Sequence, residues 1–240
     1  MPSHTGDDRA AHRSSSVALI VQSTAFMIGA ALFAVGAAAS IWDPGSARLT
    51  NALCFIGAWF FTAAGLMQLA ASGPVRARSA VGARPRVRAE WAAAATQSLG
   101  TILFNVSTSA ALTAATVSAD DRLVWRPDAG GSAAFLISAA LTSVAYARER
   151  GTAWEPSRPA WWAALLNAIG CVAFAGSAVG AYVLADGAPE NAALANWGTF
   201  IGAIAFFAAA ALALPQHAKS PAANATGLGA EDGGFEPPRA

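Results

Sequence analysis

The sequence predicts an all-α membrane protein, with six transmembrane helices arranged as three parallel two-helix hairpin repeats. Three observations lead to this prediction. Of the 240 residues, 55% are hydrophobic and only 12% are charged, which is about half the charge of an ordinary soluble domain. The apolar residues gather in six runs that contain no Asp, Glu, Lys, Arg or His. One pattern of residues also recurs among these runs, and recurrence at a fixed period indicates internal repeats.

The six runs define the expected helices, because an α-helix needs roughly 20 residues to cross the hydrocarbon layer. They cover residues 17–41, 51–71, 91–117, 129–147, 161–184 and 192–214. The fourth run is the weakest span, since it is short and diluted by glycine. The polar segments between and around the runs are expected to be a disordered N-terminal tail (1–16), a basic cytoplasmic linker (72–90), a second cytoplasmic linker (148–160) and a disordered C-terminal tail (215–240).

Arginine and lysine predict the orientation, because positively charged loops are retained in the cytoplasm. Of the 15 cationic residues, twelve lie on the side that holds both tails and both linkers, and three lie on the other side. Both termini are then cytoplasmic, which requires an even number of spans. Arginine far outnumbers lysine beside abundant alanine, as is typical of a high-GC bacterial genome. We therefore expect a multi-pass protein of the bacterial plasma membrane.

The repeat is clearest at the start of the second and third hairpins. Each starts with an amide, a glycine, a phenylalanine and a serine at positions i, i+3, i+7 and i+10, which places the four on one helix face. These residues are Gln97, Gly100, Phe104 and Ser107 in one hairpin, and Asn167, Gly170, Phe174 and Ser177 in the other. Gly29, Phe33 and Gly36 form a weaker copy in the first hairpin.

The second helices of the hairpins also resemble one another. The first and third share Asn51, Phe55, Ile56, Gly57 and Ala58 with Asn196, Phe200, Ile201, Gly202 and Ala203. We expect the middle hairpin to match them through Ser132, Ile137, Ser138 and Ala139. Hairpins in one orientation imply parallel repeats about an axis along the membrane normal.

The repeated face is expected to pack helices together. Lipid tails are as apolar as leucine, so membrane helices associate through close packing, which small residues permit. The candidate packing residues are Gly100, Phe104, Ser107, Gly170, Phe174 and Ser177. Packing within the bundle is the simpler interpretation, and association with a second copy or another membrane protein is the alternative.

Gln97, Asn105 and Asn167 are the candidate residues of a polar interior. A primary amide has two donors and two acceptor lone pairs, and hydrocarbon satisfies none of them. An interhelical hydrogen bond, contributing about 0.6–2 kcal/mol, is the simpler role. The alternative is a cavity for a neutral solute, which the many hydroxyls of the third run support.

Two further sets of residues have chemically active side chains. Asp43, Arg126 and Asp128 fall in the predicted outer loops and could form a ligand site, although an exposed ion pair is the simpler interpretation. Cys54 and Cys171 are expected to be free, because they are predicted to lie at different depths of the membrane.

The predicted spans lack the residues that intramembrane chemistry requires. Without a His, Lys or carboxylate there, we expect no haem or metal site, no Schiff base and no proton relay. The chain also shows no phosphate-binding loop and no nucleophile elbow. We therefore expect no catalytic, cofactor-binding or metal-binding residues, no cofactor and no nucleic-acid partner.

The two-span unit, with its amide, glycine, phenylalanine and small residue, resembles the YrhK-like membrane domain of bacterial proteins. The stretches that carry this resemblance are VWRPDAGGSAAFLISAAL, LLNAIGCVAFAGSA and NWGTFIGAIAFF. It covers most of residues 17–214 and implies a membrane location and hairpin units. The family has no established activity, so the resemblance transfers no functional residue.

These observations favour a non-enzymatic integral membrane protein with a structural or interaction role through small-residue helix packing. Its partners would be the lipid bilayer and a second copy or another membrane protein. The alternative function is a channel or facilitator for a small neutral solute, lined by the polar third helix.

Overall fold

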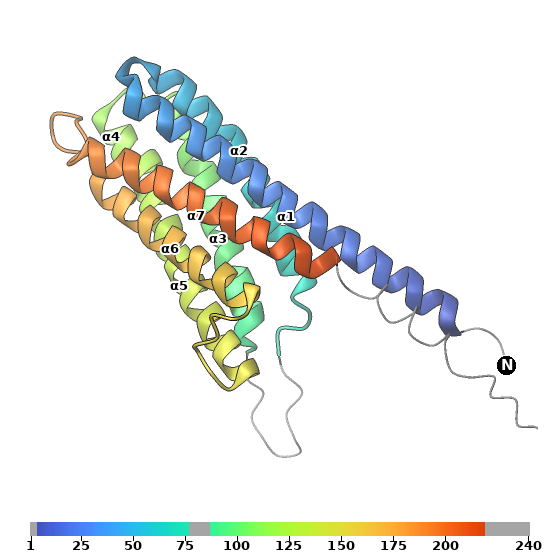
Figure 1. Cartoon of the computed structure of the whole chain (residues 1–240). Helices are drawn as coiled ribbons and strands as arrows, with labels where there is room; N and C mark the ends of the chain where they lie inside the picture. The colour runs from blue at the N-terminus through green and yellow to red at the C-terminus, as the bar shows by residue number, and fades with distance from the viewer. Residues whose placement is uncertain (1–3, 77–86, 219–240) are drawn as a thin grey trace, which may run out of the picture.

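The computed structural model describes residues 4–76 and 87–218, and within them it confirms the prediction of an all-α chain. The long helices of this part run side by side (Figure 1). They are α1 (His4–Trp42), α2 (Ala47–Ala71), α3 (Ala89–Ala111), α5 (Arg126–Arg150), α6 (Pro159–Gly180) and α7 (Ala192–Ala218). Three short helical segments join them on one side: η1 (Pro44–Ser46), α4 (Val117–Ala119) and η2 (Asp120–Trp125).

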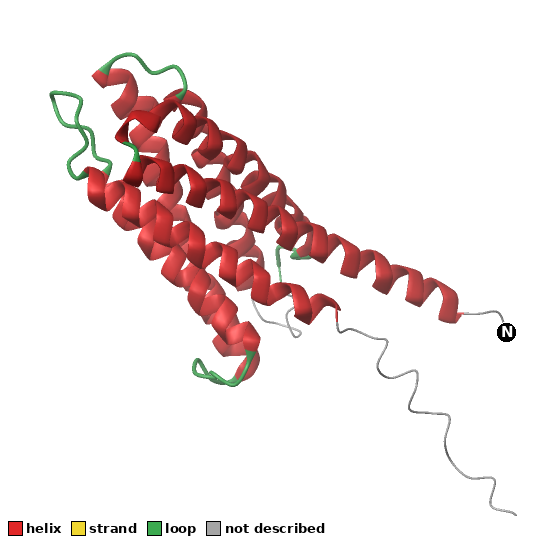
Figure 2. Cartoon of the chain, turned by 45° about the horizontal axis from the view of Figure 1, so that its top comes forward, coloured by secondary structure: helices red, strands yellow, loops and turns green. Residues whose placement is uncertain are grey.

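The long helices close into a ring. Each contacts its neighbours in the order α1, α2, α3, α5, α6 and α7, and α7 packs against α1 to complete the circle. The loops lie at the two ends of the bundle, as Figure 2 shows. Short connections make consecutive helices antiparallel neighbours, so alternate helices start at the same end.

Five segments of the described chain are long and apolar enough to cross a membrane. They are Ser16–Trp42, Ala47–Ala71, Val117–Arg150, Pro159–Gly180 and Ala192–Leu214. Their length and composition indicate a membrane-embedded protein. Val117–Arg150, which contains the weakest predicted span (129–147), is apolar enough to cross a membrane. Helix α3 is not, because its amides and hydroxyls lower its hydropathy.

The ends of the predicted spans need correction at the two tails. Helix α1 begins at His4, so most of the tail predicted to be disordered is helical. Helix α7 continues to Ala218, beyond the predicted end at 214. The remainder of the C-terminal tail (219–240) and residues 77–86 of the basic linker lie outside the described residues.

The prediction of an outer loop at residues 118–128, between the third and fourth spans, is wrong, because the non-helical connection lies earlier, at residues 112–116. Residues 117–150 are helical throughout, with a π-helical turn at Asp120–Trp125 directly before α5. Pro127 lies in the first turn of α5, where a helix tolerates a residue without an N–H. The preceding residue, Arg126, donates its backbone N–H to the Asp121 carbonyl five residues earlier, so the chain remains helical through a π turn where a proline indicated a loop.

Two helices end earlier than predicted, and in both the last carbonyl is bonded by a group outside the helix. Helix α3 ends at Ala111 rather than 117, and the Asn51 side chain donates from Nδ2 to the Ala111 carbonyl at 2.9 Å. Helix α6 ends at Gly180 rather than 184, and the Gly180 carbonyl accepts from the backbone N–H of Asn191 at 2.8 Å. A helix end is stable where such partners satisfy its free backbone groups.

Within each hairpin, a glycine of the first helix faces a phenylalanine of the second helix. A glycine of the second helix likewise faces a phenylalanine of the first. A methyl group added at Gly100 would lie 2.5 Å from two ring atoms of Phe135. One added at Gly131 would lie 2.7 Å from the Phe104 ring. The reciprocal pairs of the other hairpins are Gly29 with Phe61, Gly57 with Phe33, Gly170 with Phe206 and Gly202 with Phe174. Each phenylalanine therefore fills a notch that only glycine leaves open.

The phenylalanines of these pairs form the centre of the molecule. Phe33, Phe104 and Phe174 contact one another at ring-centroid distances of 5.5–6.2 Å. Phe206 contacts Phe61 at 6.1 Å and Phe135 at 5.8 Å. We call the six rings the phenylalanine cluster. All six are buried, and edge-to-face pairs predominate between hairpins, an arrangement that aromatic quadrupoles favour.

The expected register of the middle hairpin was wrong. Gly131, and not Ser138, takes the place of Gly57 and Gly202, because it is Gly131 that packs against Gly100 and Phe104. Ser138 lies two turns further along α5 and donates to the Ala93 carbonyl at 2.8 Å.

Candidate functional site

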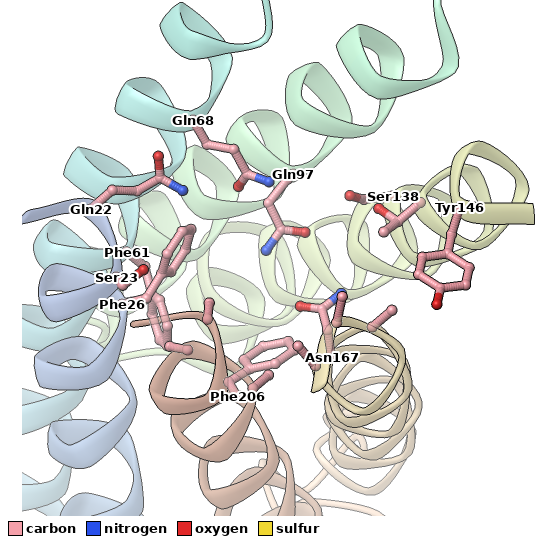
Figure 3. Close-up of a pocket in the computed structure, with 17 residues that line it drawn as sticks. Gln22, Ser23, Phe26, Phe61, Gln68, Gln97, Ser138, Tyr146, Asn167 and Phe206 are labelled. Carbon is pink, nitrogen blue, oxygen red and sulfur yellow. The ribbon is translucent and has the colours of Figure 1, made fainter. Parts of the chain in front are cut away.

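A cavity of about 300 Å³ opens at the centre of the ring, at the end where α3 and α6 begin (Figure 3). All the long helices contribute to it. Its polar lining consists of Gln22, Ser23, Gln68, Gln97, Ser138, Thr142, Tyr146 and Asn167. Its apolar lining consists of Phe26, Phe61, Phe206 and alanines of α6 and α7. Two rings of the phenylalanine cluster, Phe61 and Phe206, thus close the cavity toward the middle of the bundle.

Gln97 is the most deeply buried amide of the cavity. Its position three residues before Gly100 on the packed face of α3 turns its side chain toward the ring centre. The residue is only 7% exposed, and its Oε1 atom has no hydrogen-bond partner in the described part of the chain. A buried oxygen without a donor costs about 1–3 kcal/mol. This oxygen is itself buried, so the amide has to rotate about its terminal bond before a hydrogen-bond donor in the cavity can reach it and remove this cost.

Asn167 is the second predicted amide that the structure places in the cavity. It projects from α6 across from Gln97 (Figure 3), and its side chain makes a long hydrogen bond from Nδ2 to the Cys171 sulfur at 3.9 Å. No hydrogen bond joins Asn167 to Gln97 among the described residues. The two amides therefore share a cavity instead of satisfying each other.

Sequence reasoning missed two further amides, Gln22 of α1 and Gln68 of α2. Both line the same cavity as Gln97 (Figure 3). Each is the only amide near the end of its predicted span that was expected to be cytoplasmic, and this common depth was a usable signal. The repeat pattern hid it, since neither residue falls at the position of Gln97 and Asn167.

Asn105, the third predicted interior amide, does not reach the cavity. Its Nδ2 donates to the Ala58 carbonyl at 3.3 Å and also to the Thr62 hydroxyl, and both acceptors belong to α2. Asn105 thus joins α3 to α2 as an interhelical bond, which was the simpler of the two interpretations. Its Oδ1 is buried without a partner among the described residues.

The predicted packing residues lie inside the bundle. Gly100, Phe104, Gly170 and Phe174 belong to the reciprocal pairs described above. Ser177 bonds the Ala195 carbonyl at 2.7 Å and shares a 2.7 Å hydrogen bond with the Thr199 hydroxyl, both on α7. Ser107 is buried on α3. This face holds the hairpins themselves together and is not exposed to a second copy.

The three charged residues of the predicted outer loops do not come together as a site. Arg126 pairs with Asp121 at 2.7 Å, instead of with Asp43 or Asp128. Asp43 caps the short helix η1 by accepting from the Gly45 N–H at 3.0 Å. The exposed ion pair was the simpler interpretation, and it forms with a partner that was not considered.

A polar network holds the α5–α6 connection against the cavity. Tyr146 lines the cavity and donates from its hydroxyl to Glu155 Oε2 at 2.8 Å. Arg158 donates from Nε to the other carboxylate oxygen, Oε1, at 2.8 Å. These hydrogen bonds, from Tyr146 first and Arg158 second, hold the pKa of the Glu155 carboxyl below its usual range. Gly151, in the left-handed conformation at φ 71°, ends α5 and starts this connection.

Cys54 and Cys171 are both free thiols. Within the described residues, no group of three His, Cys, Asp or Glu side chains could hold a metal ion. In comparisons with known proteins, the chain matches no family model, no curated protein and no solved structure.

Proposed function

We propose that the chain crosses the bacterial plasma membrane six times, with both termini in the cytoplasm. Helix α3 would be the sixth span, although its composition alone does not qualify it. Its position supports this, because it lies in the ring between α2 and α5 and extends over 23 residues. Neighbouring helices can satisfy its polar side chains, as Asn105 and Ser98 illustrate: Ser98 donates to the Gly65 carbonyl of α2 at 2.8 Å.

We also propose that the three hairpins are parallel repeats of one unit. The reciprocal glycine–phenylalanine contact supports this, since it recurs in each hairpin with the same spacing of four residues in both helices. The approach of the two backbones is also alike: a methyl group added at the glycines would meet the partner carbonyl at 2.9–3.1 Å every time. The YrhK-like resemblance, which also implies hairpin units, is part of this proposal.

The function that the geometry supports best is that of a non-enzymatic integral membrane protein with a structural or interaction role. The main support is the phenylalanine cluster, whose six buried side chains pack against one another at the centre of the circle of helices. A centre of this kind makes a rigid bundle, whose remaining surface meets lipid, a second copy or another membrane protein.

A facilitator for a small neutral solute is the second candidate, and the cavity lined by Gln97 and Asn167 favours it. A solute that crossed would have to pass the phenylalanine cluster, so conduction requires these rings to move apart.

Proteoliposomes that contain the full chain separate the two candidates. The structural role predicts that urea and glycerol enter them no faster than they enter protein-free liposomes, measured by light scattering during swelling. Faster entry that Gln97→Leu abolishes would instead establish the facilitator.

Reporters fused after Leu214 and after Asp186 test the orientation. The first is expected to respond as cytoplasmic and the second as periplasmic. A periplasmic response after Leu214 would contradict the six-span arrangement.

A further inference from the structure

We propose that the cavity binds a small neutral molecule that has a flat apolar face and an amide edge. This proposal goes beyond the structural role and holds whether or not any solute crosses the membrane. It depends on three features of the cavity: its unsatisfied amides, its lack of charge and its aromatic base.

The amides require a ligand that both donates and accepts hydrogen bonds. Oε1 of Gln97 is buried without a donor in the described chain, although the residue is only 7% exposed. Figure 3 shows Gln22 and Gln68 on one side of this side chain and Asn167 on the other. Their NH₂ groups need acceptors, while the Gln97 oxygen needs a donor, which it can meet in the cavity once its amide rotates about the terminal bond. A carboxamide or lactam edge offers an N–H and a carbonyl next to each other, so it satisfies both requirements.

The charge of the lining excludes an ionic ligand. None of the residues that line the described cavity is Asp, Glu, Lys, Arg or His. A charged molecule would therefore lose its hydration without gaining a counter-charge. Glu155, the carboxylate that the lining residue Tyr146 contacts, is already held by Tyr146 and Arg158.

The apolar lining requires a flat, water-excluding part of the ligand. Phe26, Phe61 and Phe206 form the base, and alanines of α6 and α7, among them Ala164 and Ala210, form one wall. Aromatic rings stack or meet edge to face with a second ring at small cost in entropy. A volume of about 300 Å³ falls at the lower end of the range for small-molecule sites. An aromatic carboxamide combines the required size, edge and face.

Benzamide is the probe for the test, and benzoate is its charged isostere. The full chain in lipid nanodiscs is titrated with each compound, and binding is measured by saturation-transfer NMR against empty nanodiscs. We expect benzamide to bind above the level of empty nanodiscs. We expect benzoate not to do so.

Variants locate the binding. Gln97→Leu is expected to weaken benzamide binding about fivefold to tenfold, since one hydrogen bond is lost. Ala210→Phe keeps every amide but fills the cavity, and it is expected to abolish binding. Asn196→Leu removes an amide of α7 that is not among the lining residues, and it should leave the dissociation constant unchanged. Thermal unfolding of each variant shows whether it folds. If Gln97→Leu does not fold, Ala210→Phe tests the proposal in its place.

Three results would overturn the proposal. The first is benzamide binding no stronger than to empty nanodiscs. The second is binding that persists in Ala210→Phe. The third is benzoate binding as strong as that of benzamide. The swelling assay is independent of all three, so a failure here is distinguishable from a failure of the structural role.

Discussion

At the scale of single residues, the glycines of the helix faces have one physical task. A glycine opposite a phenylalanine lets two helix backbones approach so closely that even a methyl group in place of the glycine hydrogen would collide with the facing helix. Gly170 and Gly202 show this, because an added methyl at either would come within 3.1 Å of the other residue's carbonyl oxygen. Membrane helices gain little from burying apolar surface, so this close contact supplies much of their association.

Gly170→Ala is therefore expected to destabilise the protein by about 1–3 kcal/mol. The new methyl would lie 2.5 Å from Cε1 of Phe206 and 3.1 Å from the Gly202 carbonyl oxygen, so a shift of the ring alone would not relieve the crowding. The measurement is reversible unfolding in mixed micelles, followed by circular dichroism.

Gly176→Ala is the matched control in the same helix. Its nearest neighbour would be Leu194 Cδ1 at 3.9 Å, an ordinary contact. Since alanine is the better helix former, this change should be neutral or stabilising by up to about 1 kcal/mol. Equal destabilisation by both changes would show that the notch at Gly170 is unimportant.

At the scale of elements, the α5–α6 connection is held by side chains and not by regular structure. Glu155 accepts from Tyr146 at the end of α5 and from Arg158 at the start of α6. In the same connection, Trp161 donates from Nε1 to the Ala153 carbonyl at 3.0 Å. The carboxylate form of Glu155 thus orders a loop beside the cavity mouth.

This network should weaken in acid. The pKa of Glu155 is lowered from its ordinary 4.5 on folding. Its contribution to stability is then fully present above pH 4.5 and is lost as the pH falls through the lowered pKa. The indole N–H signal of Trp161 in NMR should stay constant from pH 7 to 5 and move at lower pH.

In the Glu155→Gln variant, this movement should disappear, because no group titrates at that position. An indole signal that moves equally in both proteins would show that another group is responsible.

At the scale of the whole molecule, the phenylalanine cluster connects the three hairpins. Phe33 and Phe174 belong to different hairpins and meet edge to face at 5.9 Å. Each hairpin contributes two rings, so the hairpins share one centre and are expected to unfold together.

A double-mutant cycle tests this coupling. The changes Phe33→Leu and Phe174→Leu should have an interaction energy of about 0.5–1.5 kcal/mol in unfolding. Phe33→Leu combined with Phe207→Leu is the control, since Phe207 is 37% exposed on α7. Those two changes should add within about 0.5 kcal/mol. Additivity of the first pair would mean that the hairpins are stabilised separately.

The sequence by itself determined the helical class, the membrane character and the identity of the packed face. The physical reason is that these depend on local properties: the length of an apolar run, the 3.6-residue period and the small size of glycine. It also contained a signal that was overlooked, the Gly-xxx-Phe spacing of Gly131 and Phe135, which would have corrected the register of the middle hairpin.

Only the tertiary structure decided how the amides are used. Asn105 and Gln97 stand two turns apart on one polar helix, yet one bonds α2 and the other lines a cavity. Gln22 and Gln68 join that cavity from helices where no pattern marked them. Whether an amide finds a partner depends on which helices surround it, and the closure of the ring between α1 and α7 sets that arrangement. Periodicity along one helix contains no information about that closure.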